Sequence, residues 1–322
     1  MNKVLVILGP TATGKTDLAL RLAKKFNGEL IAADSRQVYK GLDIGTGKIP
    51  GGGKWEVRGG SKMWEVGGIK IWMYDVVDLK KQYTVADYVN DASRVIRDIE
   101  KRGKLPVIVG GTGLYLKALL EGLSNLSIPV DKKIRGELEK LSLAELQGKL
   151  KTLSPIKWKK LNQSDRQNSR RLLRSIEIIM MNPYINLRDK IQETRYKYDV
   201  LKIGLTAQKE ILYKNADLRV LDWIKQGIID EARRLKEQTS GKRLRELGLE
   251  YGVLAEYLDG QITENTLVKI IQGKVHGYIK RQQTWFKKEK NINWFDITEN
   301  NYLERIEKLL YKWYYSANDK KN

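Results

Sequence analysis

The first residues of the chain form a motif that can bind phosphate. Gly9-Pro10-Thr11-Ala12-Thr13-Gly14-Lys15-Thr16 matches the spacing G-x-x-x-x-G-K-[ST] in full. In such a P-loop the glycines let backbone amides point at a phosphate, and the dipole of the following helix adds to the attraction. Lys15 supplies a positive charge, and Thr16 can bind Mg²⁺. The motif predicts a site for a di- or triphosphate and leaves open which one binds.

Asp34 is the first candidate for a general base. It follows an apolar run at 29–33 and begins the sequence Asp34-Ser35-Arg36-Gln37. Because the carboxyl ends of parallel strands face the ligand crevice, Asp34 is expected to project toward the group that the P-loop holds. The alternative is an aspartate that only caps a loop or a helix.

A third apolar run, at 105–109, leads into Gly110-Gly111-Thr112. Ordinary P-loop ATPases end this strand in an acidic residue that holds magnesium and helps to activate water. The glycines at this position argue against a motor-type or hydrolytic NTPase. They favour group transfer instead.

The elements that must position these residues alternate between strands and helices. Val4 to Leu8 is a strand-length apolar run, the P-loop follows it, and a helical pattern comes next. Residues 200–205 form a later buried-strand candidate, and 292–296 form a short edge strand. This order predicts an α/β fold, with a doubly wound parallel sheet around the P-loop and a helical C-terminal part.

The segment between the second and third strand candidates is rich in glycine and tryptophan. Ten of the 28 glycines lie between Gly41 and Gly68, together with Trp55 and Trp64. Alternation on either side of Gly67-Gly68 predicts a hairpin with a two-residue turn, a small β excursion. The tryptophans could stack on bases, but packing within the hairpin is favoured. Thr84, with Asp87 three positions later, then predicts a capped helix that stops at Gly103.

The composition indicates a globular protein with a polyanionic partner. The 322 residues include 60 Lys and Arg against 39 Asp and Glu, a net charge of +21, which points to nucleic acid. The longest stretch without a charged residue, 12 residues from Leu105 to Leu116, is shorter than the roughly 20 that a membrane helix needs. The chain has no cysteine and no secretory signal, so we expect a cytoplasmic protein without thiolate metal sites.

The positive charge is densest in a predicted helical insertion. Residues 151–200 contain 12 basic and 5 acidic side chains. We place this inserted subdomain at 124–199, between a first part of the core at 1–123 and its completion with C-terminal helices at 200–322. Arg170 and Arg174 stand at i, i+4 on one helical face, as a pair that contacts phosphates would. The alternative is a solvated face with a salt bridge from Arg174 to Glu177.

Taken together, these motifs resemble the tRNA dimethylallyltransferases. The likeness rests on the P-loop, on Asp34 to Thr46 and on Val109 to Tyr115, and it continues through 165–179, 216–235, 247–250 and 280–286. The resemblance implies transfer of a dimethylallyl group from dimethylallyl diphosphate to the exocyclic amine of the adenosine 3′-adjacent to the anticodon. It further implies that the P-loop holds the diphosphate with Mg²⁺. A monomer acting on the anticodon stem-loop, away from membranes, is expected.

The resemblance also implies roles for individual residues. Asp34 would accept the amine proton, with Thr112 and Arg219 as further catalytic residues, and Thr16 would hold the metal. The implied tRNA contacts are Asp34, Ser35, Arg36, Gln37, Thr112, Arg135, Arg170, Arg171, Arg174, Arg245, Gly248, Arg281 and Gln282. The sequence departs from the family at Leu249, where a tyrosine often follows the glycine, and in the hairpin, which replaces a short acidic connection.

Two other classes of function are alternatives to a transferase. In a P-loop kinase of a nucleoside or another small molecule, Asp34 would deprotonate a hydroxyl, and Arg170 with Arg174 would cover ATP. That class does not explain the net charge of +21. A non-enzymatic RNA-binding protein would leave the P-loop and Asp34 without a role. The only histidine, His276, is predicted to be packed or solvated rather than catalytic.

Overall fold

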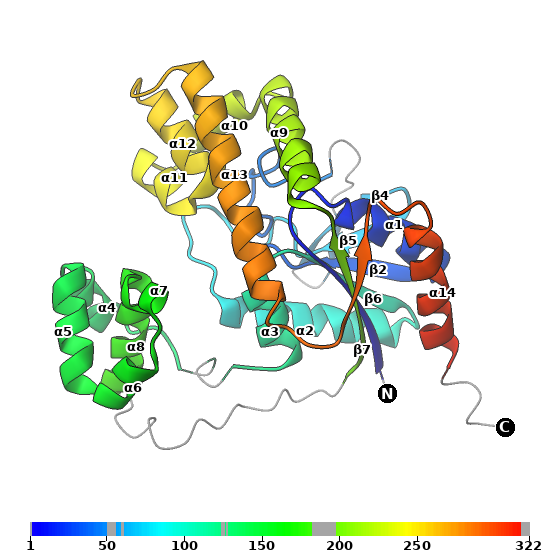
Figure 1. Ribbon diagram of the computed structural model, residues 1–322, viewed down its shortest axis with the longest axis horizontal. Coiled ribbons are helices and arrows are strands. Elements are labelled where there is room, and N and C mark those ends of the chain that lie inside the picture. Colours follow the sequence, from blue (N-terminus) through cyan, green and yellow to red (C-terminus); the bar gives the residue numbers. More distant parts are fainter. Residues whose placement is uncertain are drawn as a thin grey trace. The chain divides into compact units, whose positions relative to one another are not determined.

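The computed structural model describes residues 2–49, 56–58, 61–123, 126, 128–181 and 198–316. Contacts divide the chain into two compact units (Figure 1). The first combines Met1–Leu119 with Tyr196–Asn322, and the second is Leu120–Arg195. The division thus falls at 120 and 195, against the predicted 124 and 199. The chain completes the first unit only after the inserted second one.

The first unit is built on a mostly parallel sheet. Within the described residues the strand order is β3-β4-β5-β2-β6-β1-β7-β8. The strands are β1 (Asn2–Leu8), β2 (Gly28–Ala32), β3 (Glu56–Arg58), β4 (Ser61–Val66), β5 (Ile69–Trp72), β6 (Leu105–Gly110), β7 (Tyr198–Thr206) and β8 (Ile292–Asp296). Every neighbouring pair from β5 to β8 is parallel, whereas β3-β4 and β4-β5 are antiparallel. Parallel strands are covered on both faces, which explains the continuous apolar runs. The predicted doubly wound sheet is confirmed.

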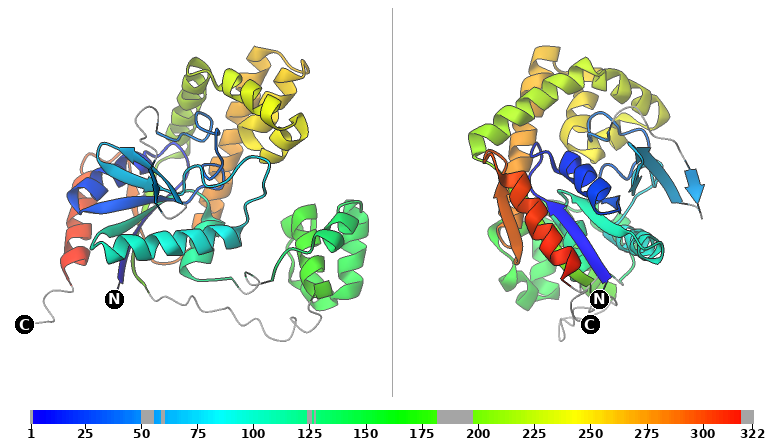
Figure 2. Two further views of the ribbon diagram at one scale, coloured as in Figure 1. Left: turned by 180° about the vertical axis from the view of Figure 1, so that it is seen from behind. Right: turned by 90° about the vertical axis from the view of Figure 1, so that its right-hand side faces the viewer.

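Helices cover both faces of this sheet. They are α1 (Lys15–Lys25), α2 (Val85–Lys101), α3 (Gly113–Leu120) and α14 (Tyr302–Tyr315). Right-handed crossovers that run in opposite directions along the sheet put α1 and α2 on opposite faces. Helix α14 lies beside α1 (Figure 2), where Glu307 pairs with Arg21 and Lys25 at 2.8 and 2.5 Å. The predicted capping box of Thr84 and Asp87 is present at the start of α2.

Five helices of the C-terminal part form a second layer over the loops at the carboxyl ends of the strands. They are α9 (Lys209–Lys225), α10 (Ile228–Gln238), α11 (Gly241–Leu247), α12 (Leu249–Leu258) and α13 (Glu264–Phe286). Their apolar faces enclose Val38, Tyr39 and Leu42, which follow β2. The loop that begins with Asp34 is therefore fixed between the sheet and these helices.

The predicted hairpin is confirmed, but it is not a separate excursion. Strands β4 and β5 pair on either side of Gly67-Gly68. Strand β5 then pairs in parallel with β2, with Ile71 opposite Leu30, and so extends the main sheet. Trp64 and Trp72 are 8% and 5% exposed, as packed residues are. Trp55 lies outside the described residues.

The second unit is helical. It contains α4 (Lys132–Leu138), α5 (Leu143–Leu153), α6 (Pro155–Lys160), α7 (Gln163–Arg166) and α8 (Ser169–Met181). Leucine and isoleucine side chains of α4, α5 and α8 form its own core. Throughout the described part of the chain, no helix is long and apolar enough to cross a bilayer.

Candidate active site

The P-loop forms a cradle at the N-terminus of α1. The backbone is left-handed at Ala12 and Gly14, with φ of 65° and 74°, a pattern that turns successive N–H groups toward an anion. Thr13 Oγ1 and Lys15 Nζ both donate to the Pro10 carbonyl, at 2.9 and 2.6 Å. A cavity of about 440 Å³, which we call the first cavity, opens on this loop. Its P-loop lining consists of Thr11, Ala12, Gly14, Lys15 and Thr16. The predicted context of strand, loop and helix is confirmed.

Lys15 and Arg219 both line the first cavity. Arg219, on α9, donates from Nη1 to Thr11 Oγ1 at 3.2 Å, and its guanidinium lies 5.1 Å from the ring centre of Trp223. Burial, together with the charge of Arg219, lowers the pKa of Lys15 to about 7. Burial also lowers the pKa of Arg219. Buried cations that repel each other are stabilised by an anion between them. The cavity is therefore electrostatically suited to a di- or polyphosphate.

Gly110 and Gly111 line the first cavity at the carboxyl end of β6. Strand β6 lies between β1 and β2, so the strand that leads to the P-loop and the strand that leads to Asp34 are roughly 10 Å apart, two strand spacings. Gly111 follows β6, and a Cβ there would lie 2.1 Å from Nε2 of Gln282. Glycine thus stands where other P-loop proteins have an acidic residue, and the absence of a side chain at Gly111 lets Gln282 of α13 pack closely against the backbone.

Gln282 connects Gly111 to the P-loop. Its Oε1 accepts from the backbone N–H of Thr11 at 2.9 Å, and its Nε2 donates to the carbonyl of Gly111 at 3.1 Å. The side chain is buried, with 5% exposed. The resemblance implies a tRNA contact at Gln282, which stays a prediction; in the structure its amide joins the P-loop to Gly111.

Asp34 is positioned by hydrogen bonds between the ends of β2 and β6. The Ala33 N–H donates to Val109 O at 2.7 Å, and the Ser35 N–H donates to Thr112 Oγ1 at 3.2 Å. Asp34 Oδ1 accepts from the backbone N–H of Arg36 at 2.8 Å. The capping role that the sequence left open is therefore real, and it fixes the carboxylate at the cavity wall. Thr112, predicted as catalytic, supports the loop behind Asp34.

A second cavity of about 250 Å³ adjoins the first. The two share six lining residues: Thr11, Asp34, Thr46, Arg219, Trp223 and Tyr278. The second cavity also exposes Ser35, Arg36 and Arg281, three of the predicted tRNA contacts. Gln37, a fourth, lines the first cavity. Asp34 is therefore accessible from both sides, from the P-loop and from a basic pocket.

Sequence reasoning missed two titratable residues of the second cavity. Glu250 is 3% exposed, and burial raises its pKa to about 7. Tyr278 faces both cavities and hydrogen-bonds Thr112; burial raises the pKa of its hydroxyl, which stays protonated. Tyr278, Arg281 and Gln282 share one face of α13 at i, i+3, i+4, and this spacing is the signal that could have identified Tyr278.

The remaining predicted residues of the first unit lie near the start of α12. Gly248 has a φ of 70° and joins α11 to α12. Arg245 forms an ion pair with Asp259 at 2.8 Å. His276 stacks on Tyr213 with ring centres 3.9 Å apart, and it is packed as predicted.

In the second unit, the basic residues differ in how they are used. Arg135 and Arg174 both bind the buried carboxylate of Glu177, at 2.6 and 2.9 Å, so the salt bridge named as an alternative is present. Arg171 pairs with Asp165, and Arg170 is exposed. Arg170, Arg171 and Arg174 line one shallow groove. Of the two arginines predicted to contact phosphates as an i, i+4 pair, Arg174 therefore forms an ion pair with Glu177, and Arg170 is exposed.

Comparisons with known proteins identify the family. A family model described as "IPP transferase" matches residues 37–289, and a second, "Isopentenyl transferase", matches residues 2–64. The chain belongs to the IPP transferase family. A tRNA dimethylallyltransferase of Anoxybacillus flavithermus is 36% identical over 94% of this chain and 93% of its own. A tRNA dimethylallyltransferase 2 of Treponema denticola is 39% identical over 90% and 94%.

Solved structures of IPP transferase relatives agree with this assignment. The full-length tRNA isopentenylpyrophosphate transferase of Bacillus halodurans has a TM-score of 0.66 and 31% identity, with 97% of each chain covered. A eukaryotic dimethylallyltransferase acting on tRNA has a TM-score of 0.76 and 26% identity, with 97% of this chain and 79% of that chain covered. The resemblance found in the motifs and the predicted fold class are both confirmed.

Proposed function

We propose that this protein transfers the dimethylallyl group of dimethylallyl diphosphate to the exocyclic amine of the adenosine 3′-adjacent to the tRNA anticodon, releasing diphosphate. The observation that carries this proposal is the position of Asp34 between two adjoining cavities, one on the P-loop and one lined by Arg36 and Arg281. The enzyme acts as a monomer. Membership of the IPP transferase family, whose name specifies an isopentenyl and not a phosphoryl group, sets the kinase interpretation aside.

The first cavity is the donor side. As the allylic carbon–oxygen bond breaks, positive charge develops on the dimethylallyl unit and negative charge on the diphosphate. Donors held ready at the leaving group stabilise that separation. The P-loop amides, Lys15 and Arg219 are such donors. Ile44, Tyr74 and Trp223 line the same cavity and offer apolar surface to the hydrocarbon group.

Mg²⁺ fits this donor side through Thr16. Magnesium keeps most of its waters and binds one or two protein oxygens together with substrate phosphates, and the Thr16 hydroxyl borders the cavity. The described residues contain no group of three metal-ligating side chains that would hold the ion without substrate. The bound ion would neutralise charge on the leaving group.

The second cavity is the acceptor side. The target base leaves its stack, which costs a few kcal/mol and least in a loop such as the anticodon. Its amine nitrogen forms the new bond to the allylic carbon while its proton passes to the Asp34 carboxylate. Arg36 and Arg281 bind the neighbouring phosphates. Basic residues of the second unit, Arg170 among them, add affinity for the tRNA backbone.

Replacement of Asp34 tests this mechanism. Asp34→Asn keeps the shape of the side chain and removes its basicity, so turnover is expected to fall by about 10²- to 10⁴-fold, with tRNA affinity within a few-fold of wild type. Asp78→Asn is the matched control, because Asp78 is exposed and lines neither cavity. Full turnover by Asp34→Asn would contradict the role of the carboxylate.

A further inference from the structure

The hairpin tryptophan Trp64 contacts the wall of the first cavity from behind. Its ring packs edge-on against Tyr74, with ring centres 5.5 Å apart and planes at 85°. Its Nε1 donates to Asp75 Oδ2 at 2.8 Å. Tyr74 itself lines the first cavity. Strand β4 therefore reaches the donor site through two adjacent residues, Tyr74 and Asp75.

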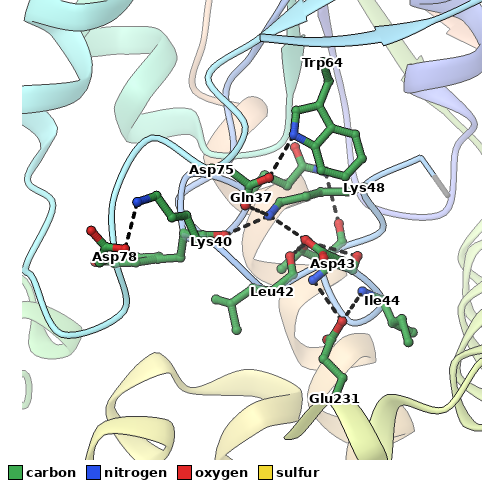
Figure 3. Close-up of polar contacts among 12 residues, drawn as sticks. Gln37, Lys40, Leu42, Asp43, Ile44, Lys48, Trp64, Asp75, Asp78 and Glu231 are labelled. Carbon is green, nitrogen blue, oxygen red and sulfur yellow. Dashed lines mark hydrogen bonds and ion pairs between the residues drawn. The ribbon is translucent and has the colours of Figure 1, made fainter. Parts of the chain in front are cut away.

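Asp75 binds Lys48 as well as Trp64, so its carboxylate links the two side chains (Figure 3). Its Oδ1 accepts from Lys48 Nζ at 2.6 Å, and the Lys48 side chain is fully buried. The same ammonium donates to the Tyr39 carbonyl and to Asp43 Oδ1, each at 2.8 Å. All three donors of Lys48 are used, and a buried charge with such partners strongly resists displacement.

The residues on either side of Tyr74 have strained backbone conformations. Met73 and Asp75 have φ of 70° and 54°, left-handed values that L-residues rarely adopt. Alternating conformations aim Tyr74 at the cavity while Asp75 binds Lys48. Such strain persists where the surroundings over-determine it, and it clusters at functional sites.

Lys48 in turn fixes the loop that forms the cavity wall. Ile44, Gly47 and Lys48 line the first cavity. On the other side of this loop, Glu231 Oε2 accepts from the backbone N–H groups of Asp43 and Ile44, at 3.1 and 2.9 Å (Figure 3). The loop is thus held between α10 and the hairpin, through one buried charge on each side.

The placement of this loop also determines the room for Arg219. Gly47 has a φ of 63°, and a Cβ there would lie 1.8 Å from Arg219 Nη2. The backbone of the loop therefore borders the guanidinium that we assign to the diphosphate. A shift of the loop by a fraction of an ångström would change that contact.

We propose that Trp64 is a positioning residue of the donor site: through Asp75, Lys48 and Tyr74 it sets the wall that encloses the allylic diphosphate. The inference rests on the proposed function. Tyr74, Lys48 and Gly47 line the first cavity alone, whereas Thr46, in the same loop, lines both cavities and Gly45 lines the second. Loss of the hairpin contact is therefore expected to weaken use of the diphosphate donor more strongly than use of tRNA.

Trp64→Phe tests the proposal, because it removes the indole N–H and keeps an aromatic ring against Tyr74. The matched control is Trp72→Phe in the next strand, which removes an equivalent bond from Trp72 Nε1 to the buried Glu29 at 2.8 Å. Glu29 keeps Arg102 and Lys104 as partners and lines neither cavity. The two variants lose the same kind of hydrogen bond at two different places.

We expect Trp64→Phe to raise KM for dimethylallyl diphosphate by up to about tenfold, the factor that corresponds to the free energy of one hydrogen bond to a charged group, while KM for tRNA changes much less. Trp72→Phe should leave both constants unchanged. Asp75→Asn should show the same split as Trp64→Phe and serves if that variant does not fold. A merely structural role would reduce the active fraction, lowering kcat with both KM values intact. That result, or equal effects in the two tryptophan variants, would overturn the proposal. Wild-type enzyme without transfer activity would instead overturn the proposed function.

Discussion

Lys15 is expected to take up a proton when diphosphate binds. Its pKa is lowered to about 7 by burial and by Arg219, and a bound polyanion restores the charged form. At pH 8 about 10% of Lys15 is then protonated in the free enzyme, so binding takes up about 0.9 proton; at pH 7 the uptake is about 0.5. Because the bound form carries the additional proton, the affinity that Lys15 contributes is complete well below pH 7, is halved at about pH 7 and decreases about tenfold per pH unit well above it.

Calorimetry with inorganic diphosphate measures this uptake, from the dependence of the binding enthalpy on the ionisation enthalpy of the buffer. Diphosphate ionises in the same range, so Lys15→Met supplies the baseline, and Lys15→Arg, which stays charged throughout, supplies a second control. The difference between wild type and Lys15→Met should be close to 0.9 proton at pH 8 by the reasoning above. Equal uptake by the two proteins would refute the assignment of Lys15 as a partly neutral cation that the ligand charges.

Three further outcomes are expected. Arg170→Ala should weaken binding of different cognate tRNAs about equally and flatten the slope of log affinity against log salt by somewhat less than one unit, because a phosphate contact carries no sequence information; an unchanged slope would return Arg170 to a solvated face. Arg174→Ala should instead destabilise the second unit by about 2 kcal/mol in chemical denaturation, because the buried Glu177 loses a charged partner. Burial opposes ionisation of Glu29, but hydrogen bonds from Arg102, Lys104 and Trp72 outweigh it and lower the pKa of Glu29 to about 2. The ionised carboxylate therefore adds roughly 3 kcal/mol to the free energy of unfolding above pH 4.5, and this stability is lost as the pH falls from 4.5 to 2. Curves of stability against pH for Glu29→Gln should lack this dependence.

The donor side of the site could be predicted from the sequence because its determinants are local. The P-loop spacing fixes a strand, a turn and a helix within about 25 residues, and Asp34 directly follows a recognisable strand. The capping box of Thr84 is likewise a four-residue signal. Parallel topology then places the P-loop and Asp34 together, because the carboxyl ends of parallel strands meet at the same edge of the sheet.

The contacts that organise the site could not be predicted in this way, because they join distant parts of the chain. The hydrogen bond between Gln282 and Thr11 joins residues 271 positions apart, and no local sequence pattern around either residue predicts it. The parallel pairing of β5 with β2 likewise depends on tertiary packing, so the alternation that predicts the hairpin does not predict that it extends the main sheet. The burial of Glu250, which raises its pKa, likewise results from packing between distant parts of the chain, so the sequence does not predict it.

The central claim is that the chain moves a dimethylallyl group, and not a phosphoryl group, onto tRNA. Purified protein should be incubated with Mg²⁺, unmodified tRNA, dimethylallyl diphosphate labelled in its hydrocarbon part and ATP labelled in its γ-phosphate, followed by digestion of the tRNA to nucleosides. The account predicts that the hydrocarbon label appears on the adenosine 3′-adjacent to the anticodon, with one diphosphate released per transfer and no use of ATP. Phosphate label on any acceptor, with the hydrocarbon label left on its diphosphate, would contradict it.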